Sequence, residues 1–403
     1  MKRSHAESFA PGSTATLGDI TGNVDTSAGA WDSVDEFPPL ERVVLAANGN
    51  LQRLVSSYYN AAVTVTVLHN SCVRRGVYER AVRLSVHGAT FGIAVSNVRL
   101  LSEQRIAEID EHGLAIGQMF RQLNIMPTFE LQGAGHLAPG VPSSKSLPNV
   151  PAWNTRAESC CFDANGKGED VARFWRHYVL AATDLECEIH EVLRSDMFSL
   201  LPWDSLKAAA AEAAPITSRA TTHGDDHIPS SAPNLGDIMA PCVTFMPLPN
   251  GFTPLQRMLL TANGNVERIL SAYYAKPMQL YVVLNHMRAD GSVYDRQSIL
   301  LFEGRQLMLA KSTIFLTDDK WRQVLQQEKL EVGALFRRFS ELPTFTLHST
   351  GQGEGFFWRQ YSLKASGMTC EINETFSSDA FGTAEGDELA VETPMAGGDN
   401  FGI

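Results

Sequence analysis

The sequence predicts an α+β protein made of two tandem copies of a six-stranded antiparallel sheet, with helices packed on one side of each sheet. Residues 39–59 recur as residues 254–274 at an offset of 215 (263 − 48), with 12 of the 21 aligned positions identical. Both copies continue with the same order of short, alternating apolar and polar segments, which is typical of strands. A match of this length indicates two copies of one domain.

The elements of the first copy follow from its periodicity. Residues 40–46 and 50–59 have helical spacing, and the Asn48-Gly49 pair between them is typical of a helix end. A helical pair is expected at residues 103–111 and 115–123. Short polar turns join the strands, which predicts antiparallel pairing. The six predicted strands lie at residues 62–69, 77–86, 90–100, 128–132, 171–182 and 186–193.

The copies differ by one insertion. The offset falls from 216 (333 − 117) to 183 (374 − 191), so the first copy carries about 33 additional residues. They span roughly residues 133–170, are rich in Gly, Pro and Ser, and are expected to form a lid or surface loop. The predicted organisation is a flexible segment at 1–35, a first domain at 36–200, a linker at 201–245, a second domain at 246–377 and a disordered acidic tail at 378–403.

Composition excludes several classes of function. The net charge of −12 argues against nucleic acid and anionic membranes as partners, because phosphate contacts need clustered Lys and Arg. No apolar run reaches the length of a membrane span, and the N-terminus lacks a signal peptide's apolar block. The six cysteines show no CxxC spacing. We therefore expect a cytoplasmic protein with reduced thiols, in which the two domains pack together; its oligomeric state is left open.

No cofactor or metal is predicted. The sequence contains no P-loop, dinucleotide fingerprint or nucleophile elbow. Histidines of the first copy do not follow a metal-like spacing. These histidines are His69, His112, His136, His177 and His190.

Each copy offers one arginine and one glutamate on an otherwise apolar strand face. Because side chains alternate along a strand, Arg80 shares a face with four neighbours, and Arg296 does the same in the second copy. Glu191 shares a face of the last strand with Cys187, and Glu374 shares the equivalent face with Cys370. An arginine in an apolar row is costly unless an anion meets it.

Two interpretations of these residues remain open. The Arg and the Glu of each copy could form a structural pair within the sheet. Alternatively, Arg80 or Arg296 could bind a ligand carboxylate through two of its guanidinium nitrogens. Burial raises the pKa of a carboxyl group, so Glu191 or Glu374 would then donate or accept a proton. The tyrosine pairs at residues 58–59 and 273–274 are expected to pack helix against sheet.

Three kinds of segment recur in both copies. They are an Arg followed by an apolar strand and a Gly turn (80–88 and 296–304), a Gly-containing helix (116–120 and 332–336), and a closing hairpin in which Trp-Arg precedes a Glu (175–191 and 358–374). Together with the order of elements, these segments resemble the chorismate lyase family. That family has a six-stranded antiparallel fold and splits chorismate into 4-hydroxybenzoate and pyruvate.

The resemblance implies roles for particular residues. Arg80 and Arg296 would bind the substrate carboxylate, and Glu191 and Glu374 would lie at the ring hydroxyl, so these four are the candidate catalytic residues. Backbone NH groups near the Gly turn and the helix start would assist. The remaining substrate-binding candidates are Gly88, Gly304, Gly117, Gly333, Trp175, Trp358, Arg176 and Arg359.

The duplication and long tails depart from typical chorismate lyases, which are short and single-copy. We therefore expect a cofactor-independent enzyme of secondary metabolism that performs lyase, cyclisation or pericyclic chemistry on an unsaturated carboxylated metabolite. One alternative is a chorismate pyruvate-lyase. Another is a non-catalytic ligand-binding protein, because the fold also resembles the effector domain of GntR-type regulators, although the chain lacks their basic helix-turn-helix. One copy could also merely support the other.

Overall fold

The computed structural model describes residues 36–112, 120, 126–137, 171–200, 245–328, 336 and 341–382. It confirms two tandem six-stranded antiparallel sheets with few helices. The first copy consists of α1 (Pro39–Leu45), α2 (Leu51–Tyr59), β1 (Val63–Arg74), β2 (Val77–Val86), β3 (Ala89–Leu100), α3 (Glu103–His112), β4 (Thr128–Leu137), β5 (Arg173–Ala182) and β6 (Leu185–Arg194).

The second copy repeats this order. Its elements are α7 (Pro254–Leu260), α8 (Val266–Tyr274), β7 (Gln279–Met287), β8 (Val293–Phe302), β9 (Arg305–Leu316), α9 (Asp319–Glu328), β10 (Thr344–Gly353), β11 (Phe356–Ala365) and β12 (Met368–Ser377). The strand order is β1-β2-β3-β6-β5-β4 in the first sheet, and the second sheet has the equivalent order β7-β8-β9-β12-β11-β10.

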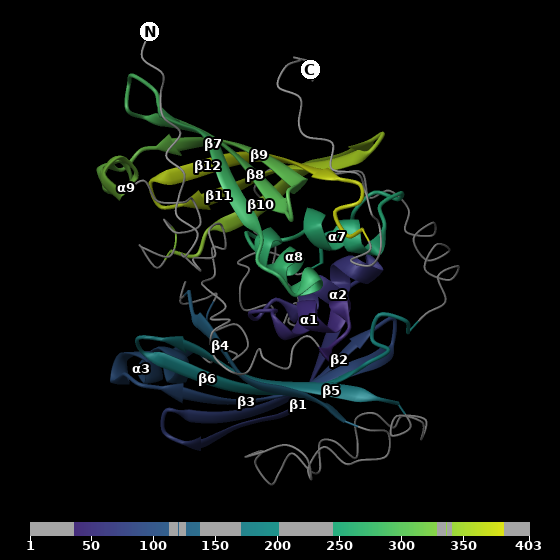
Figure 1. Cartoon of the computed structure of the whole chain (residues 1–403). Helices are drawn as coiled ribbons and strands as arrows, with labels where there is room; N and C mark the ends of the chain where they lie inside the picture. Colours follow the sequence, from purple (N-terminus) through teal and green to yellow (C-terminus); the bar gives the residue numbers. More distant parts are fainter. Residues whose placement is uncertain are drawn as a thin grey trace, which may run out of the picture.

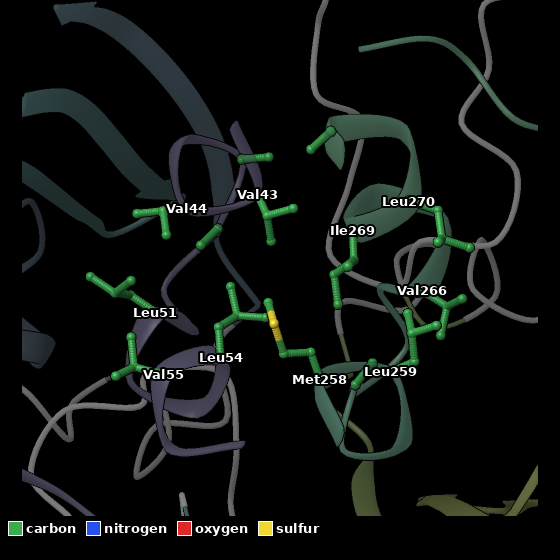
Figure 2. Close-up of a cluster of buried hydrophobic side chains, with 14 of the residues drawn as sticks. Val43, Val44, Leu51, Leu54, Val55, Met258, Leu259, Val266, Ile269 and Leu270 are labelled. Carbon is green, nitrogen blue, oxygen red and sulfur yellow. The ribbon is translucent and has the colours of Figure 1, made fainter. Parts of the chain in front are cut away.

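The paired helices lie between the two sheets, with α1 and α2 on one sheet and α7 and α8 on the other (Figure 1). α1 packs against α8, and α2 packs against α7. Figure 2 shows the apolar side chains that meet there, with Leu54 facing Met258 across the junction. Both residues are at most 3% exposed, and they belong to one continuous core that includes side chains of both sheets. Burial of this shared apolar surface holds the copies together.

A reciprocal pair of arginines joins the helix ends. Arg42 of α1 donates through Nε to the carbonyl of Ala272 (2.9 Å) and through Nη2 to that of Tyr273, at the C-terminus of α8. Its counterpart Arg257 donates through Nε to the carbonyl of Ser57 (2.9 Å) and through Nη2 to that of Tyr58. A guanidinium satisfies the carbonyls that a helix C-terminus leaves unpaired, and its charge complements the helix dipole. The two contacts are related by the offset of 215, so the copies are arranged with approximate twofold symmetry.

The tyrosine pairs pack their helices mainly against the segments that follow the last strand of each sheet, and Tyr274 also stacks on Phe302 of β8. The Tyr59 hydroxyl donates to the carbonyl of Met197 (2.7 Å), and the Tyr274 hydroxyl donates to the carbonyl of Ala380 (2.9 Å). Ala380 has no exposed surface. The prediction that the disordered tail begins at residue 378 is therefore wrong, because residues 378–382 pack against α8. Residues 383–403 lie outside the described part of the chain.

β4 is longer than predicted and occupies the start of the expected insertion. Gly133 and Gly135 belong to this strand and pair with β5. A Cβ atom at Gly135 would lie 2.7 Å from the Trp175 ring, so the glycine is required by the close approach of that ring. The rest of the insertion (138–170), the N-terminal segment (1–35) and the linker up to residue 244 lie outside the described residues, as does most of the predicted helix at 115–123.

None of the helices in the described ranges combines the length and the apolar character needed to cross a membrane.

Replacing Arg257 with methionine should lower the free energy of unfolding by about 2–4 kcal/mol, because carbonyls of α2 lose a charged donor in a partly buried junction. Urea denaturation of the full chain measures this loss. Arg99→Met is the matched control, since Arg99 is half-exposed and pairs with Glu186 at the surface. Equal losses for the two variants would contradict a role of Arg257 in joining the copies.

Candidate functional site

The faces of the two sheets that carry the helices, here called the inner faces, present the same rows of side chains. Cross-strand register aligns Arg80, Ser96, Ile189 and Tyr178 in one row of the first sheet. The second sheet aligns Arg296, Ser312, Ile372 and Tyr361 in the equivalent row. The row on one side contains Tyr78 and Cys187, and the row on the other side contains Glu191 and Arg176. The equivalent rows of the second sheet contain Tyr294 and Cys370, and Glu374 and Arg359. Each inner face therefore carries two arginines in different surroundings.

The glutamate row is a buried hydrogen-bonded network. Arg176 Nε donates to Glu191 Oε2 at 2.6 Å, and the Tyr178 hydroxyl donates to Glu191 Oε1 at 3.0 Å. Arg176 Nη1 also donates to the carbonyls of Val44 (2.5 Å) and Ala47 (2.6 Å) at the end of α1. Arg176 has no exposed surface and Glu191 is 5% exposed. The network thus fastens the end of α1 to the sheet.

The second copy contains the same network. Arg359 Nε donates to Glu374 Oε2 at 2.7 Å, and the Tyr361 hydroxyl donates to Glu374 Oε1 at 2.8 Å. Arg359 Nη1 donates to the carbonyls of Leu260 and Ala262 at the end of α7. Burial is the main cause that raises the pKa of Tyr361 well above its usual value, and the negative charge of Glu374 adds to it. The Tyr361 hydroxyl therefore remains a donor.

These contacts correct two expectations. A structural Arg–Glu pair is present in each sheet, but its arginine is Arg176 or Arg359 and not Arg80 or Arg296. Arg176 and Arg359 are fully buried and bonded to backbone and glutamate, so they offer no surface to a substrate. Both oxygens of each glutamate accept a hydrogen bond from protein, which leaves Glu191 and Glu374 poorly suited to donate a proton to a ligand.

Arg80 has different surroundings. Its side chain is partly buried between two apolar clusters of the inner face, one under α1 and α2 and the other under α3. Among the described residues no carboxylate lies within ion-pair distance of Arg80, and burial lowers the pKa of its guanidinium. Its counterpart Arg296 is 9% exposed, and burial lowers its pKa to about 10, so it is still charged at neutral pH.

Sequence reasoning did not assign three neighbours of these arginines to the site. Ser96 follows Arg80 in its row and is partly exposed, and Cys187 and Tyr78 lie in the adjacent row. Burial raises the pKa of Cys187 to about 12, which makes it a neutral thiol. All three recur in the second copy, and that recurrence was the signal that could have found them. The counterparts are Ser312, Cys370 and Tyr294.

Each inner face is completed by the other copy. Leu342, just before β10, packs into the apolar cluster of the first sheet, and its counterpart Met126 packs against that of the second. The guanidinium of Arg268 in α8 lies over the Phe129 ring of the first sheet, with its Cζ 5.8 Å from the ring centroid. Its counterpart Arg53 in α2 contacts Met246, which packs against the second sheet. The two candidate sites are therefore composite.

The remaining predicted ligand contacts lie elsewhere. Gly88 forms a two-residue turn with His87, and both have positive φ (77° and 49°). This turn is eight residues from Arg80 along an extended strand, roughly 26 Å away, so one small ligand cannot contact both. Gly304 occupies the equivalent turn with φ of 83°. Gly117 and Gly333 lie outside the described residues.

The two tryptophans face away from the arginines. Trp175 alternates with Arg176 along β5 and lies on the opposite, outer face, where it covers Gly133 and Gly135. Trp358 occupies the equivalent position and covers Gly351. Trp175 and Trp358 therefore lie on the opposite face of each sheet from Arg80 and Arg296, so they cannot line the same site as those arginines.

The prediction that the histidines form no ligand cluster also needs correction. His177 and His190 are direct cross-strand partners on the outer face of the first sheet, and Glu188 lies beside them. Sequence spacing could not reveal this group, because two strands contribute to it.

No protein-family model matches the chain, and the comparison with curated proteins gives no match. The fold and the rows of its inner faces describe the chain as a duplicated antiparallel α+β protein with two arginines on the inner face of each copy.

Replacing Glu191 with glutamine should destabilise the fold by about 3–5 kcal/mol, because it leaves the Arg176 charge buried without its counter-ion. Glu374→Gln should have a similar effect in the second copy. Chemical denaturation measures both changes, and Glu186→Gln is the control, because this β6 side chain is 37% exposed. Wild-type stability of Glu191→Gln would contradict a structural role.

Proposed function

We propose that each copy binds a small carboxylated molecule on its inner face, with Arg80 or Arg296 holding the carboxylate. The chain would act on this molecule as a cofactor-independent lyase or rearrangement enzyme of secondary metabolism. The observation that supports the proposal is the position of Arg80, a partly buried cation among apolar side chains without a carboxylate of the described chain beside it.

The surroundings favour a ligand with one charged end and an apolar body. A carboxylate can accept two parallel hydrogen bonds from a guanidinium, and this pairing is stronger where water is excluded. The body of the ligand would lie along Ser96 and Ile189, toward the apolar cluster that includes Tyr78 and Cys187. Neighbouring strands are about 4.8 Å apart, so the row from Arg80 to Tyr178 spans roughly 14 Å. This length suits a small metabolite.

The chemistry would depend on positioning and charge stabilisation. Because Glu191 and Glu374 are engaged in structural networks, reactions that need no protein base are favoured. Concerted elimination and pericyclic rearrangement are such reactions. In a chorismate pyruvate-lyase reaction of this kind, the ring–oxygen bond to the enolpyruvyl group breaks. The ring hydrogen passes to the enolpyruvyl methylene carbon, which yields pyruvate and aromatic 4-hydroxybenzoate.

A second candidate is a ligand-binding protein without turnover. The observation that favours it is the same engagement of both glutamates, which removes the proton donor that the resemblance to chorismate lyases implies. This candidate shares the Arg80 and Arg296 sites but predicts a ligand that is bound and not consumed.

The test uses the full chain with chorismate as substrate and 4-hydroxybenzoate as a binding probe. We expect 4-hydroxybenzoate to raise the melting temperature in a saturable way. The double variant Arg80→Gln/Arg296→Gln should weaken this binding by about 100-fold, the cost of roughly 3 kcal/mol for a lost charged pair. Arg83→Gln is the control, because Arg83 lies on the same strand but faces outward.

The products distinguish the candidates. Release of pyruvate with 4-hydroxybenzoate identifies the lyase, and an isomer of chorismate identifies a rearrangement. Binding of chorismate without consumption favours the binding protein. If the double variant binds both compounds as tightly as Arg83→Gln does, the inner-face arginines are not the site.

A further inference from the structure

The outer face of the first sheet carries a group of metal-ligating side chains that the inner-face site does not use. His177 of β5 and His190 of β6 are opposite each other in register, and their rings stack with centroids 3.9 Å apart. Glu188 lies two residues before His190, on the same face. Its Oε1 is 3.0 Å from His177 Nε2 and 3.7 Å from His190 Nε2.

His190 is the unusual member of this group. It is 4% exposed, and within the described part of the chain neither of its ring nitrogens has a hydrogen-bond partner; Glu188 Oε1 reaches Nε2 only at ion-pair distance. Val95 is its neighbour on β3 and is 3% exposed, so one side of the ring is apolar. A buried polar side chain without a partner requires an explanation, because such groups are almost always satisfied. A simple His177–Glu188 hydrogen bond accounts for those two residues but leaves His190 unexplained.

We propose that His177, Glu188 and His190 bind a divalent cation of the zinc type. Two imidazoles and one carboxylate are a donor set that Zn²⁺ uses in proteins. The three ligand atoms all lie within 4.8 Å of one another. Bonds of about 2.0–2.1 Å to a tetrahedral zinc place ligand atoms roughly 3.4 Å apart. The two stacked rings would turn apart on binding, so that one nitrogen of each points at the ion.

The site is partly exposed, and a bound cation would keep an open position. The side chains of His177 and Glu188 are 18% and 25% exposed, which gives a cation a path to the buried His190. Three protein ligands leave at least one coordination position for water or a further ligand. The site lies on the opposite face of the sheet from Arg80 and is therefore independent of the proposed carboxylate site.

The second copy provides an internal control. Its equivalent positions are Gln360, Asn373 and Glu371, in which amides replace both histidines. These three residues are exposed, and Asn373 is flanked by the exposed Lys311 instead of a buried valine. The same face of the same fold thus exists without the cluster, so the histidines are not required by the architecture of the sheet.

The experiment titrates the untagged full chain, freed of metal by a chelator, with Zn²⁺ in a calorimeter. We expect one equivalent to bind, and Co²⁺ in its place should give the intense visible absorption of a tetrahedral centre. We expect each ligand variant to weaken Zn²⁺ binding by at least about 100-fold, because losing a residue that only orients a ligand already weakens metal binding by about 10- to 100-fold. The variants are His177→Gln, His190→Asn and Glu188→Gln. His177→Gln and His190→Asn introduce the residues that occupy the equivalent positions of the second copy.

His348→Gln is the control, because this histidine bonds to Ser362 in the second sheet and lies outside the cluster. It should bind Zn²⁺ as the wild type does. The partly exposed positions 177 and 188 keep the test decisive if the variant at 190 does not fold. The proposal is overturned if the wild type takes up no stoichiometric Zn²⁺, or if the folded His177→Gln and Glu188→Gln variants bind it undiminished. Neither result bears on the chorismate experiments.

Discussion

The structure depends on a guanidinium that is buried completely in each copy. Arg176 and Arg359 have no exposed surface, so each must find its counter-charge and acceptors inside the protein. Glu191 or Glu374 supplies the charge, and the last carbonyls of α1 or α7 supply the acceptors. Each contact fixes a helix end at a defined place on its sheet. Arg80 and Arg296 lie one row away and remain outside this network.

The helices fixed in this way join the two copies. Arg42 and Arg257 reach across to the helix ends of the opposite copy, and the apolar faces of all four helices form one core between the sheets. Met126 and Leu342 also contribute to the opposite inner face. The two copies therefore pack within one chain as the subunits of a homodimer would. Because each copy has its own sequence, one copy can acquire residues that the other lacks. The histidine cluster, present in the first copy alone, shows that divergence.

The sequence predicted the fold well because strand alternation and internal repetition are local signals. It predicted the Arg–Glu pair with the wrong arginine, because register decides which of several inward side chains meet, and a single sequence does not display register. The same limit explains the tryptophans, assigned to a site on the face opposite to theirs, and the cluster of His177 with His190. β4 was predicted too short because Gly133 and Gly135, which accommodate Trp175, are usually signs of a loop.

The central claim is that the two arginines of each inner face have separate roles, one binding a ligand and one holding the fold. Side-chain ¹⁵Nε resonances of arginine test it directly during a titration with 4-hydroxybenzoate. The account predicts that the signals of Arg80 and Arg296 shift in a saturable way, while those of Arg176 and Arg359 keep their positions. Shifts confined to Arg176 and Arg359, with Arg80 and Arg296 unchanged, would contradict it.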